Sequence, residues 1–223
     1  MQIRGHSAPV YACTYLNELI YSTAGDRFVT CWDHETGEQQ TFTLKSESPA
    51  YCLAGIPENM LLLIGCANGT LLIVDPIEKK LIGEHNYFGH AIFSLTHFPD
   101  QQWIIAGDAE GNLLICDYAG KLLASFPLNC GKIRQLLMAK EELFAACQDG
   151  TWRSFDLPQL NETRKQHAHE NGVNALYYDV VARQLITGGK DGHIRLWDLT
   201  TCQLLDVVPV RTSISAPRIQ ERA

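Results

Sequence analysis

The sequence predicts an all-β protein made of five copies of one four-stranded antiparallel unit, and two observations support this prediction. The first is a recurring segment, in which a polar turn and a short apolar strand end in an Asp, at Asp33, Asp75, Asp117, Asp156 and Asp198. Those aspartates lie 42, 42, 39 and 42 residues apart, so one unit repeats along the chain. The second is the length of the apolar runs, five to nine residues between Gly, Asp, Asn or Pro, which is typical of strands.

The first unit shows the four expected strands in order. They are APVYACTYL, ELIYSTAG, RFVTCWD and QQTFTL, rich in Val, Ile, Tyr, Phe and Thr. Asp-Gly or Asn-Gly pairs at 68, 149 and 191, and EGN at 110, supply the positive-φ residues that tight hairpin turns need. The pattern indicates about twenty strands and no convincing helix. The expected units span about residues 5–43, 46–84, 88–126, 129–166 and 169–209, and residues 211–223 are expected to form an atypical, disordered tail.

Composition excludes several classes of function. The net charge is −7 and the 18 Lys and Arg residues are dispersed, so we expect no nucleic-acid binding. No apolar run approaches the roughly 20 residues that a membrane span needs, and no signal peptide is evident, so a cytoplasmic location without membrane binding is expected. The eight cysteines lack C-x-x-C spacing and are expected to be small buried side chains. His167 and His169 lack a third ligand nearby, so we expect no metal and no cofactor.

A four-stranded sheet of this size cannot bury both of its faces alone, and radial packing of each sheet on the next solves this problem. With a period near 40 residues, a Gly-His opening at GHSAPV and Trp-Asp closings at CWD and LWD, residues 5–209 resemble the WD-repeat β-propeller family. In that family four residues of a blade form a hydrogen-bonded chain. Blades one and five match it most fully, with His6, Ser22, Asp26 and Trp32, and with His169, Thr187, Asp191 and Trp197.

Blades two to four depart from that pattern. Their Trp positions hold Val74, Cys116 and Phe155, and their Ser or Thr positions hold Ile64, Ala106 and Ala145. We therefore expect apolar packing in place of the hydrogen-bonded chain. Phe88 rather than His90 aligns with the His position of blade three, so His90 is expected in a loop. His6, Ser22 and Asp26 do not suggest a nucleophilic triad, because Ser22 lies in mid-strand and not on a strained turn.

The resemblance implies a non-catalytic interaction scaffold, because members of the family mostly dock partners on the narrower top face around the central channel. The implied docking residues are Tyr11, Pro49, Tyr51, Phe93, Lys132, Arg134, Gln148, Asn174 and Lys190. The resemblance also implies that the following residues lie on this face: Pro9, Gly25, Ala67, Ala91, Ala109 and Gly172. Aromatic residues beside Arg and Lys favour an acidic, partly apolar peptide of a protein partner.

Three alternatives to this function stay open. The top-face residues are ordinary rim residues without a ligand, the chain is a hydrolase-type enzyme with a pocket in the channel, or it is a structural spacer in a larger assembly. The expected channel strands, among them VYACTYL and IRQLLM, carry almost no acidic, His or Ser residues, which disfavours the enzyme.

The number of blades also leaves two arrangements open. Five blades close into a ring with about 72° per blade, or they form an arc of a seven-blade ring with about 51° per blade. We favour the arc, because VRTSISAPRIQERA follows the last expected strand without alternation. An open arc leaves two sheet faces uncovered, so self-association is expected in that case.

Overall fold

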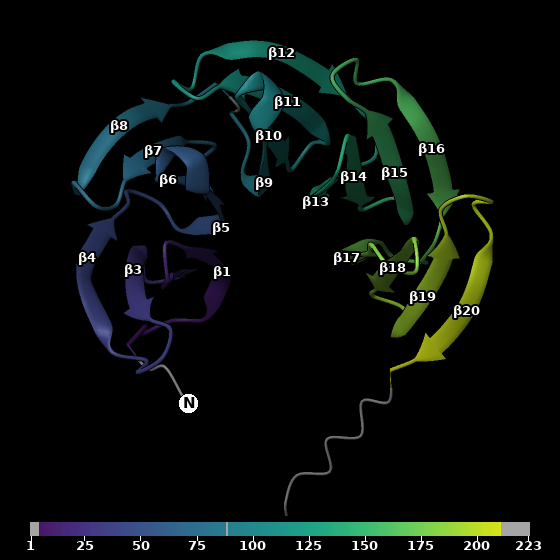
Figure 1. The fold of residues 1–223 in the computed structure, drawn as a ribbon, viewed down its shortest axis with the longest axis horizontal. Helices are drawn as coiled ribbons and strands as arrows, with labels where there is room; N and C mark the ends of the chain where they lie inside the picture. The colour runs from purple at the N-terminus through teal and green to yellow at the C-terminus, as the bar shows by residue number, and fades with distance from the viewer. Residues whose placement is uncertain (1–4, 88, 211–223) are drawn as a thin grey trace, which may run out of the picture.

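The computed structural model describes residues 5–87 and 89–210, which form five four-stranded antiparallel sheets arranged around a central space (Figure 1). Each sheet is one blade, and consecutive strands pair within it from the innermost to the outermost. The strands of blade 1 are β1 (Val10–Leu16), β2 (Leu19–Ala24), β3 (Phe28–Asp33) and β4 (Gln39–Lys45). Those of blade 2 are β5 (Ala50–Ile56), β6 (Leu61–Cys66), β7 (Leu71–Asp75) and β8 (Lys80–His85). Those of blade 3 are β9 (Ile92–Phe98), β10 (Trp103–Asp108), β11 (Asn112–Asp117) and β12 (Leu122–Pro127).

The last two blades repeat the arrangement. The strands of blade 4 are β13 (Ile133–Ala139), β14 (Glu142–Cys147), β15 (Thr151–Asp156) and β16 (Glu162–His167). Those of blade 5 are β17 (Val173–Asp179), β18 (Gln184–Gly189), β19 (His193–Asp198) and β20 (Leu204–Pro209). Two single 3₁₀ turns, η1 (Pro57–Asn59) and η2 (Pro99–Gln101), are the helical elements of the described residues. The prediction of a five-unit all-β fold is therefore confirmed.

The hydrophobic core is divided into four clusters, one between each pair of consecutive blades. Leu16 and Tyr21 of blade 1, for example, pack with Leu62 and Ile64 of blade 2. The same relation joins blades 2 and 3, blades 3 and 4, and blades 4 and 5. Most strands of the three inner layers thus bury both faces, which explains their near-continuous apolar sequences, while the outermost strands stay largely exposed.

Side chains of the innermost strands also bond to the backbone of the next blade. The thiol of Cys52 lies 3.6 Å from the carbonyl oxygen of Ile92, and the hydroxyl of Ser94 donates to the carbonyl of Ile133 at 3.3 Å. Gln135 makes two such bonds with Leu176, donating from Nε2 at 3.2 Å and accepting the backbone N–H at 2.7 Å. These bonds join β5 to β9, β9 to β13 and β13 to β17 around the central space.

The five blades form an open arc and not a closed ring. Figure 1 shows blade 1 and blade 5 separated by a gap, with β1 on one side and β19 and β20 on the other. Each pair of consecutive inner strands is in contact, from β1 and β5 to β13 and β17, whereas β1 and β17 share no contact of this kind. The arc that the sequence favoured is thus the arrangement of the described residues.

Three smaller expectations concern particular segments. Six cysteines are buried, but Cys202 is half-buried in the loop between β19 and β20, and Cys13 is exposed, because among the described residues no other blade packs on the face of blade 1 that carries Cys13. His90 is exposed in a loop, as expected. Phe88 and the expected tail at 211–223 lie outside the described residues. Among the residues described, none of the helical segments has the length and hydropathy to cross a bilayer.

Candidate protein-binding site on the top face

One hydrogen bond repeats in every blade and defines the face that carries the predicted site. The residue before the β-turn that joins the second and third strands donates its backbone N–H to the backbone carbonyl of the residue directly before the inner strand. The donor–acceptor pairs are Gly25 and Pro9 (3.0 Å), Ala67 and Pro49 (2.8 Å), Ala109 and Ala91 (2.9 Å), Gln148 and Lys132 (3.0 Å), and Lys190 and Gly172 (3.3 Å). The predicted positions therefore gather at one end of the five sheets, which we call the top face.

A pocket of about 860 Å³ opens on this face and is lined by the inner strands of all five blades. Seven of the nine predicted docking residues line it, namely Tyr11, Tyr51, Phe93, Lys132, Arg134, Asn174 and Lys190. Pro49 and Gln148 do not line it. Gln148 instead accepts the backbone N–H of Lys132 through Oε1 at 3.3 Å and so supports the edge of the pocket.

The half of the pocket on blades 1 to 3 is aromatic. Tyr11 meets Tyr51 edge-on with ring centroids 5.2 Å apart, and Tyr51 stacks on Phe93 at 5.0 Å. The residues before the turns in these blades are small, and a Cβ added to Gly25 would lie 3.1 Å from the hydroxyl oxygen of Tyr11. Gly25 thus leaves room for the Tyr11 ring, which would have to shift slightly if a larger residue stood there. The three rings form one continuous apolar wall, and the two Tyr rings carry polar hydroxyl tips.

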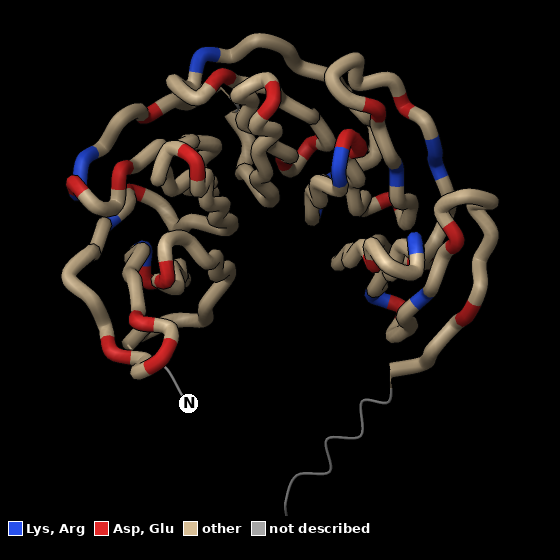
Figure 2. The backbone as a smooth tube through the Cα atoms, viewed as in Figure 1, with Lys and Arg blue, Asp and Glu red and all other residues tan. Residues whose placement is uncertain are grey.

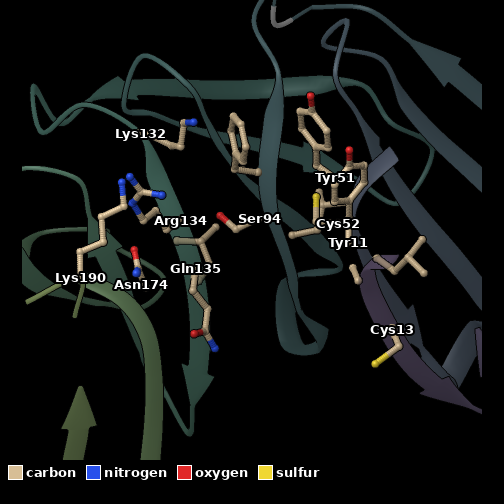
Figure 3. A pocket seen from close by; sticks show the side chains of 15 residues that line it. Tyr11, Cys13, Tyr51, Cys52, Ser94, Lys132, Arg134, Gln135, Asn174 and Lys190 are labelled. Carbon is tan, nitrogen blue, oxygen red and sulfur yellow. The ribbon is translucent and has the colours of Figure 1, made fainter. Parts of the chain in front are cut away.

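The half of the pocket on blades 4 and 5 is cationic. Figure 3 shows Lys132, Arg134 and Lys190 on one side of the pocket, with Asn174 below them and Tyr11 and Tyr51 on the opposite side. The inner strands β1, β5 and β9 of blades 1 to 3 carry no Lys, Arg, Asp or Glu (Figure 2). The inner strand of blade 4, β13, carries Arg134. The Nζ of Lys132 lies 3.8 Å from the centroid of the Phe93 ring, so a cation–π contact joins the two halves.

The electrostatics of the cationic half show unbalanced positive charge. Burial lowers the pKa of Lys132, and the neighbouring charges of Arg134 and Lys190 lower it further. No Asp or Glu lines the pocket. Among residues 5–87 and 89–210, none of the ion pairs includes any of these three cations. The pocket is thus a local positive region on a chain of net charge −7.

Sequence reasoning missed several residues that shape the pocket from below. Cys52, Ser94 and Gln135 line it one residue after the top-face aromatic or Arg positions. The signal available in the sequence was their polar character at one repeated position of otherwise apolar inner strands. Because the acceptors belong to the following blade, their role in joining blades became visible only in the assembled arc.

The residues assigned to a hydrogen-bonded chain in blades 1 and 5 lie in contact. In blade 1, His6 donates from Nδ1 to Asp26 at 3.0 Å, accepts the Ser22 hydroxyl at 2.8 Å, and Trp32 donates from Nε1 to Ser22 at 2.7 Å. In blade 5, His169 donates from Nδ1 to Asp191 at 2.9 Å and accepts the hydroxyl of Thr187 at 2.8 Å. Trp197 donates to Thr187 at 3.1 Å. Each of these two series of hydrogen bonds ends at the Asp in the turn before the third strand, Asp26 or Asp191. That Asp also accepts a backbone N–H at the start of the third strand.

The expectation of apolar packing holds in blade 4 at the Trp and Ser or Thr positions, where Phe155 and Ala145 are buried in the core, but a buried charge that was not expected lies at a neighbouring position. Arg153, whose side chain is only 6% exposed, donates to Asp149 at 3.0 Å and to Glu162 at 3.3 Å. It also donates to the backbone carbonyl of Leu128 at 2.9 Å. Arg153 occupies the position of Leu72 in blade 2 and Leu114 in blade 3, where packing is apolar as expected. The buried guanidinium requires these acceptors because an unpaired buried charge is costly.

Blade 3 uses a different residue at its turn. The buried carboxylate of Asp108 accepts the backbone N–H groups of Glu110 and Asn112 at 2.9 and 2.8 Å. It also accepts the side-chain amide of Asn112 at 2.7 Å. Asp108 lies two residues before the expected turn acid, Glu110, so alignment of the repeats alone does not identify it. Throughout the part of the chain that the structure describes, no three His, Cys, Asp or Glu side chains are grouped so that they could hold a metal ion.

Two family models match this chain. The LRRK2 beta propeller model matches residues 21–144, and the WD domain, G-beta repeat model matches residues 160–198. Among curated proteins, the U3 small nucleolar RNA-associated protein 21 homolog of Schizosaccharomyces pombe is 25% identical over 70% of this chain. DDB1- and CUL4-associated factor 10 of Mus musculus is 29% identical over 60% of it, and human WD repeat and FYVE domain-containing protein 2 is 25% identical over 82%.

The chain covers 17%, 27% and 48% of the lengths of those three relatives, so it corresponds to a part of each. Solved structures show the same fold at low identity. The computationally designed Ika8 protein superposes with a TM-score of 0.78 at 20% identity, over 94% of this chain and 64% of that one. U3-55K superposes with a TM-score of 0.83 at 16% identity, over 93% of this chain and 66% of that one. Because a propeller model matches more than half of the sequence and a repeat model matches the outer strand of blade 4 and the first three strands of blade 5, the chain belongs to the WD-repeat β-propeller family.

Proposed function

We propose that the protein is a non-catalytic interaction scaffold whose top face binds an acidic, partly apolar peptide segment of a protein partner. The observation that carries this proposal is the division of one pocket into an aromatic half and a cationic half. Aromatic rings supply apolar contact at low entropic cost, and the cations select for an acidic segment.

Two further observations support a partner of this kind. The aromatic rings Tyr11, Tyr51 and Phe93 are held against one another, so little side-chain order must be gained on binding. DDB1- and CUL4-associated factor 10, one of the relatives, carries in its name an association with two other proteins. A protein partner fits both the pocket and this relationship.

Partner capture by an immobilised chain tests the proposal. Arg134→Glu reverses one charge of the cationic half, and Tyr51→Ala removes the ring that contacts both other aromatics. We expect each variant to weaken recovery of a captured partner by at least about tenfold, the effect of losing one well-buried contact at an interface. The measurement is quantitative mass spectrometry of the bound proteins, combined with circular dichroism to establish that each variant retains the fold.

Lys121→Glu is the matched control, because Lys121 is exposed in the turn between β11 and β12 and does not line the pocket. It changes the net charge by the same amount as Arg134→Glu and should leave recovery unchanged. Undiminished recovery with both pocket variants would refute binding at the top face.

A further inference from the structure

The cationic half of the pocket carries more positive charge than a single carboxylate balances. Lys132, Arg134 and Lys190 face one side of the pocket, and no acidic side chain lines it (Figure 3). Lys132 and Arg134 are partly buried, so water screens their mutual repulsion less than it would on an open surface. Three positive charges in one recess create a site that an anion of more than one charge satisfies best.

The cationic half of the pocket also contains hydrogen-bond donors that have no partner among the described residues. The Nε of Arg134 is buried and has no hydrogen-bond partner among the described residues. No side-chain hydrogen bond engages the ammonium group of Lys132 or Lys190 within the described chain, and the Lys132 ammonium lies over the ring of Phe93. Ammonium and guanidinium groups together offer several donors directed at one recess, which suits a group with three acceptor oxygens.

The aromatic half of the pocket indicates which kind of ligand would present such an anion. Phe93 lies beside the cations, and its contact with Lys132 places an apolar wall directly next to the charge, which continues to Tyr51 through the stacked rings. An apolar residue adjacent to the anion would therefore be buried at the same time. A lipid bilayer fits this site less well, because the cations are recessed in a pocket. The whole chain also carries a net charge of −7, which an anionic membrane surface repels.

We propose that the cationic half of the top-face pocket binds a phosphorylated side chain of the partner peptide, and that the aromatic half binds an apolar residue beside it. This inference rests on the proposed peptide-binding function and specifies its ligand. A phosphomonoester carries a charge of about −1.5 to −2 at pH 7 and three strong acceptor oxygens, whereas Asp or Glu carries a single charge on two oxygens. The site therefore distinguishes phosphorylation from ordinary acidity.

Degenerate peptide pools that differ at one position test this. Each pool has an aliphatic or aromatic residue next to a fixed central residue, which is phosphoserine, phosphothreonine, phosphotyrosine, Glu or Ser. Affinities are measured by fluorescence anisotropy at fixed ionic strength, because the contribution of such charges depends on salt. We expect at least one phosphorylated pool to bind about tenfold or more tightly than the Glu pool, since charge-assisted hydrogen bonds to a dianion are the stronger ones.

Variants separate the two halves of the pocket. Lys190→Gln removes a charge from an exposed residue, so the fold should tolerate it, and we expect it to reduce the advantage of the phosphorylated pool over the Glu pool by about tenfold. Tyr51→Ala should weaken the phosphorylated and Glu pools by the same factor, because the ring contacts the apolar residue present in both. Lys121→Gln is the matched control, and it should leave every pool unaffected.

The outcomes distinguish this inference from the function on which it rests. Equal binding of the phosphorylated and Glu pools, with both lost in Arg134→Glu, would overturn the phosphate site and leave acidic-peptide binding standing. Binding of no pool would overturn both. If phosphatidylcholine vesicles containing phosphatidylinositol 4-phosphate bind through Lys190 and no phosphorylated pool is preferred, the site belongs to a membrane lipid and the inference is wrong. Displacement by inorganic phosphate at the same concentration as the peptide would also overturn it, because the aromatic half would then contribute nothing.

Discussion

His169 holds the blade 5 turn through two bonds made by opposite ring nitrogens. Its Nδ1 donates to Asp191, and its Nε2 accepts from Thr187, so the neutral ring satisfies both partners. Arg195 lies beside both Asp191 and the Nδ1 of His169, which disfavours a second proton on the ring. Burial, together with the Arg195 charge, holds the pKa of His169 below its usual value.

This arrangement predicts a pH-dependent stability. Because the folded-state pKa of His169 is lowered, the unfolded chain binds the proton first as pH falls below about 6.5, so the free energy of unfolding decreases from that pH downward. Asp191 adds a second loss. Burial alone would raise its pKa, but hydrogen bonds from His169, Arg195 and the backbone of His193 bring it down to about 2. Stability contributed by this carboxylate is present above pH 4 and is lost as pH falls towards 2.

Thermal unfolding followed by circular dichroism between pH 7 and pH 5 measures the first of these losses. His169→Gln should lower stability at pH 7 and make it less dependent on pH over this range. His90→Gln changes an exposed loop histidine and should preserve the slope of the parent protein. A parent protein that is equally stable at pH 7 and pH 5 would contradict the assignment of a neutral His169.

At the scale of single strands, blade 4 places an ion-paired charged side chain at a core position where blades 2 and 3 place an apolar one. Its third strand, β15, carries Arg153 where the third strands of blades 2 and 3 carry Leu, and the ion pairs to Asp149 and Glu162 replace apolar contacts at that position. The carboxylates of Asp149 and Glu162 are 32% and 39% exposed, whereas the Arg153 side chain is 6% exposed. Water can therefore hydrate the acids in the absence of the Arg, but cannot hydrate the Arg in the absence of the acids.

This asymmetry predicts unequal effects of two substitutions. Arg153→Leu recreates the side chain of blades 2 and 3 and should lower the free energy of unfolding by about 1 kcal/mol or less. Asp149→Asn keeps an acceptor for the turn but removes the main counter-charge of a buried guanidinium, and it should cost about 2 kcal/mol, reduced from the fully buried case by the exposure of Asp149. Urea denaturation of both variants measures the difference. A larger loss for Arg153→Leu would contradict the argument.

Elements were more predictable than the contacts between them. The Asp-Gly and Asn-Gly turns place glycines at positive φ, including Gly69 at 85° and Gly150 at 87°, as the hairpin spacing required. Arg153 and Asp108 were missed for a physical reason. A buried Arg or Asp has no sequence signature that separates it from an exposed one, because its burial depends on acceptors or donors from other strands and turns.

At the scale of the whole molecule, the arc leaves one sheet face uncovered at each end. Val10 of blade 1 is 56% exposed and Cys13 is also exposed, whereas Leu53, Leu95 and their equivalents at the Cys13 position are at most 8% exposed in the other blades. At the other end, Tyr177 is 63% and Val208 43% exposed. Apolar sheet faces of this kind are sites of association.

We therefore predict that the chain self-associates in solution through these two faces. Light scattering should show an average mass that rises with concentration. Replacing Val10 and Tyr177 together by Lys should lower that mass towards the monomer value, because like charges then face each other between copies. Val181→Lys is the control, since Val181 is 96% exposed in a loop and lies on neither face. A parent protein that remains monomeric at every concentration would show that the open faces do not drive association.

The sequence by itself determined the repeat, the four strands of each unit, the turns, and the residues that face the top of the blades. These follow from local patterns, namely a period of about 42 residues, apolar runs of strand length and turn residues at fixed offsets. Only the tertiary structure decided that the five described blades form an arc and that seven of the predicted docking residues line one pocket with an aromatic and a cationic half. The physical reason is that closure and pocket shape depend on how far each blade turns relative to the last. That angle is set by packing between sheets, which the pattern within any one repeat does not contain.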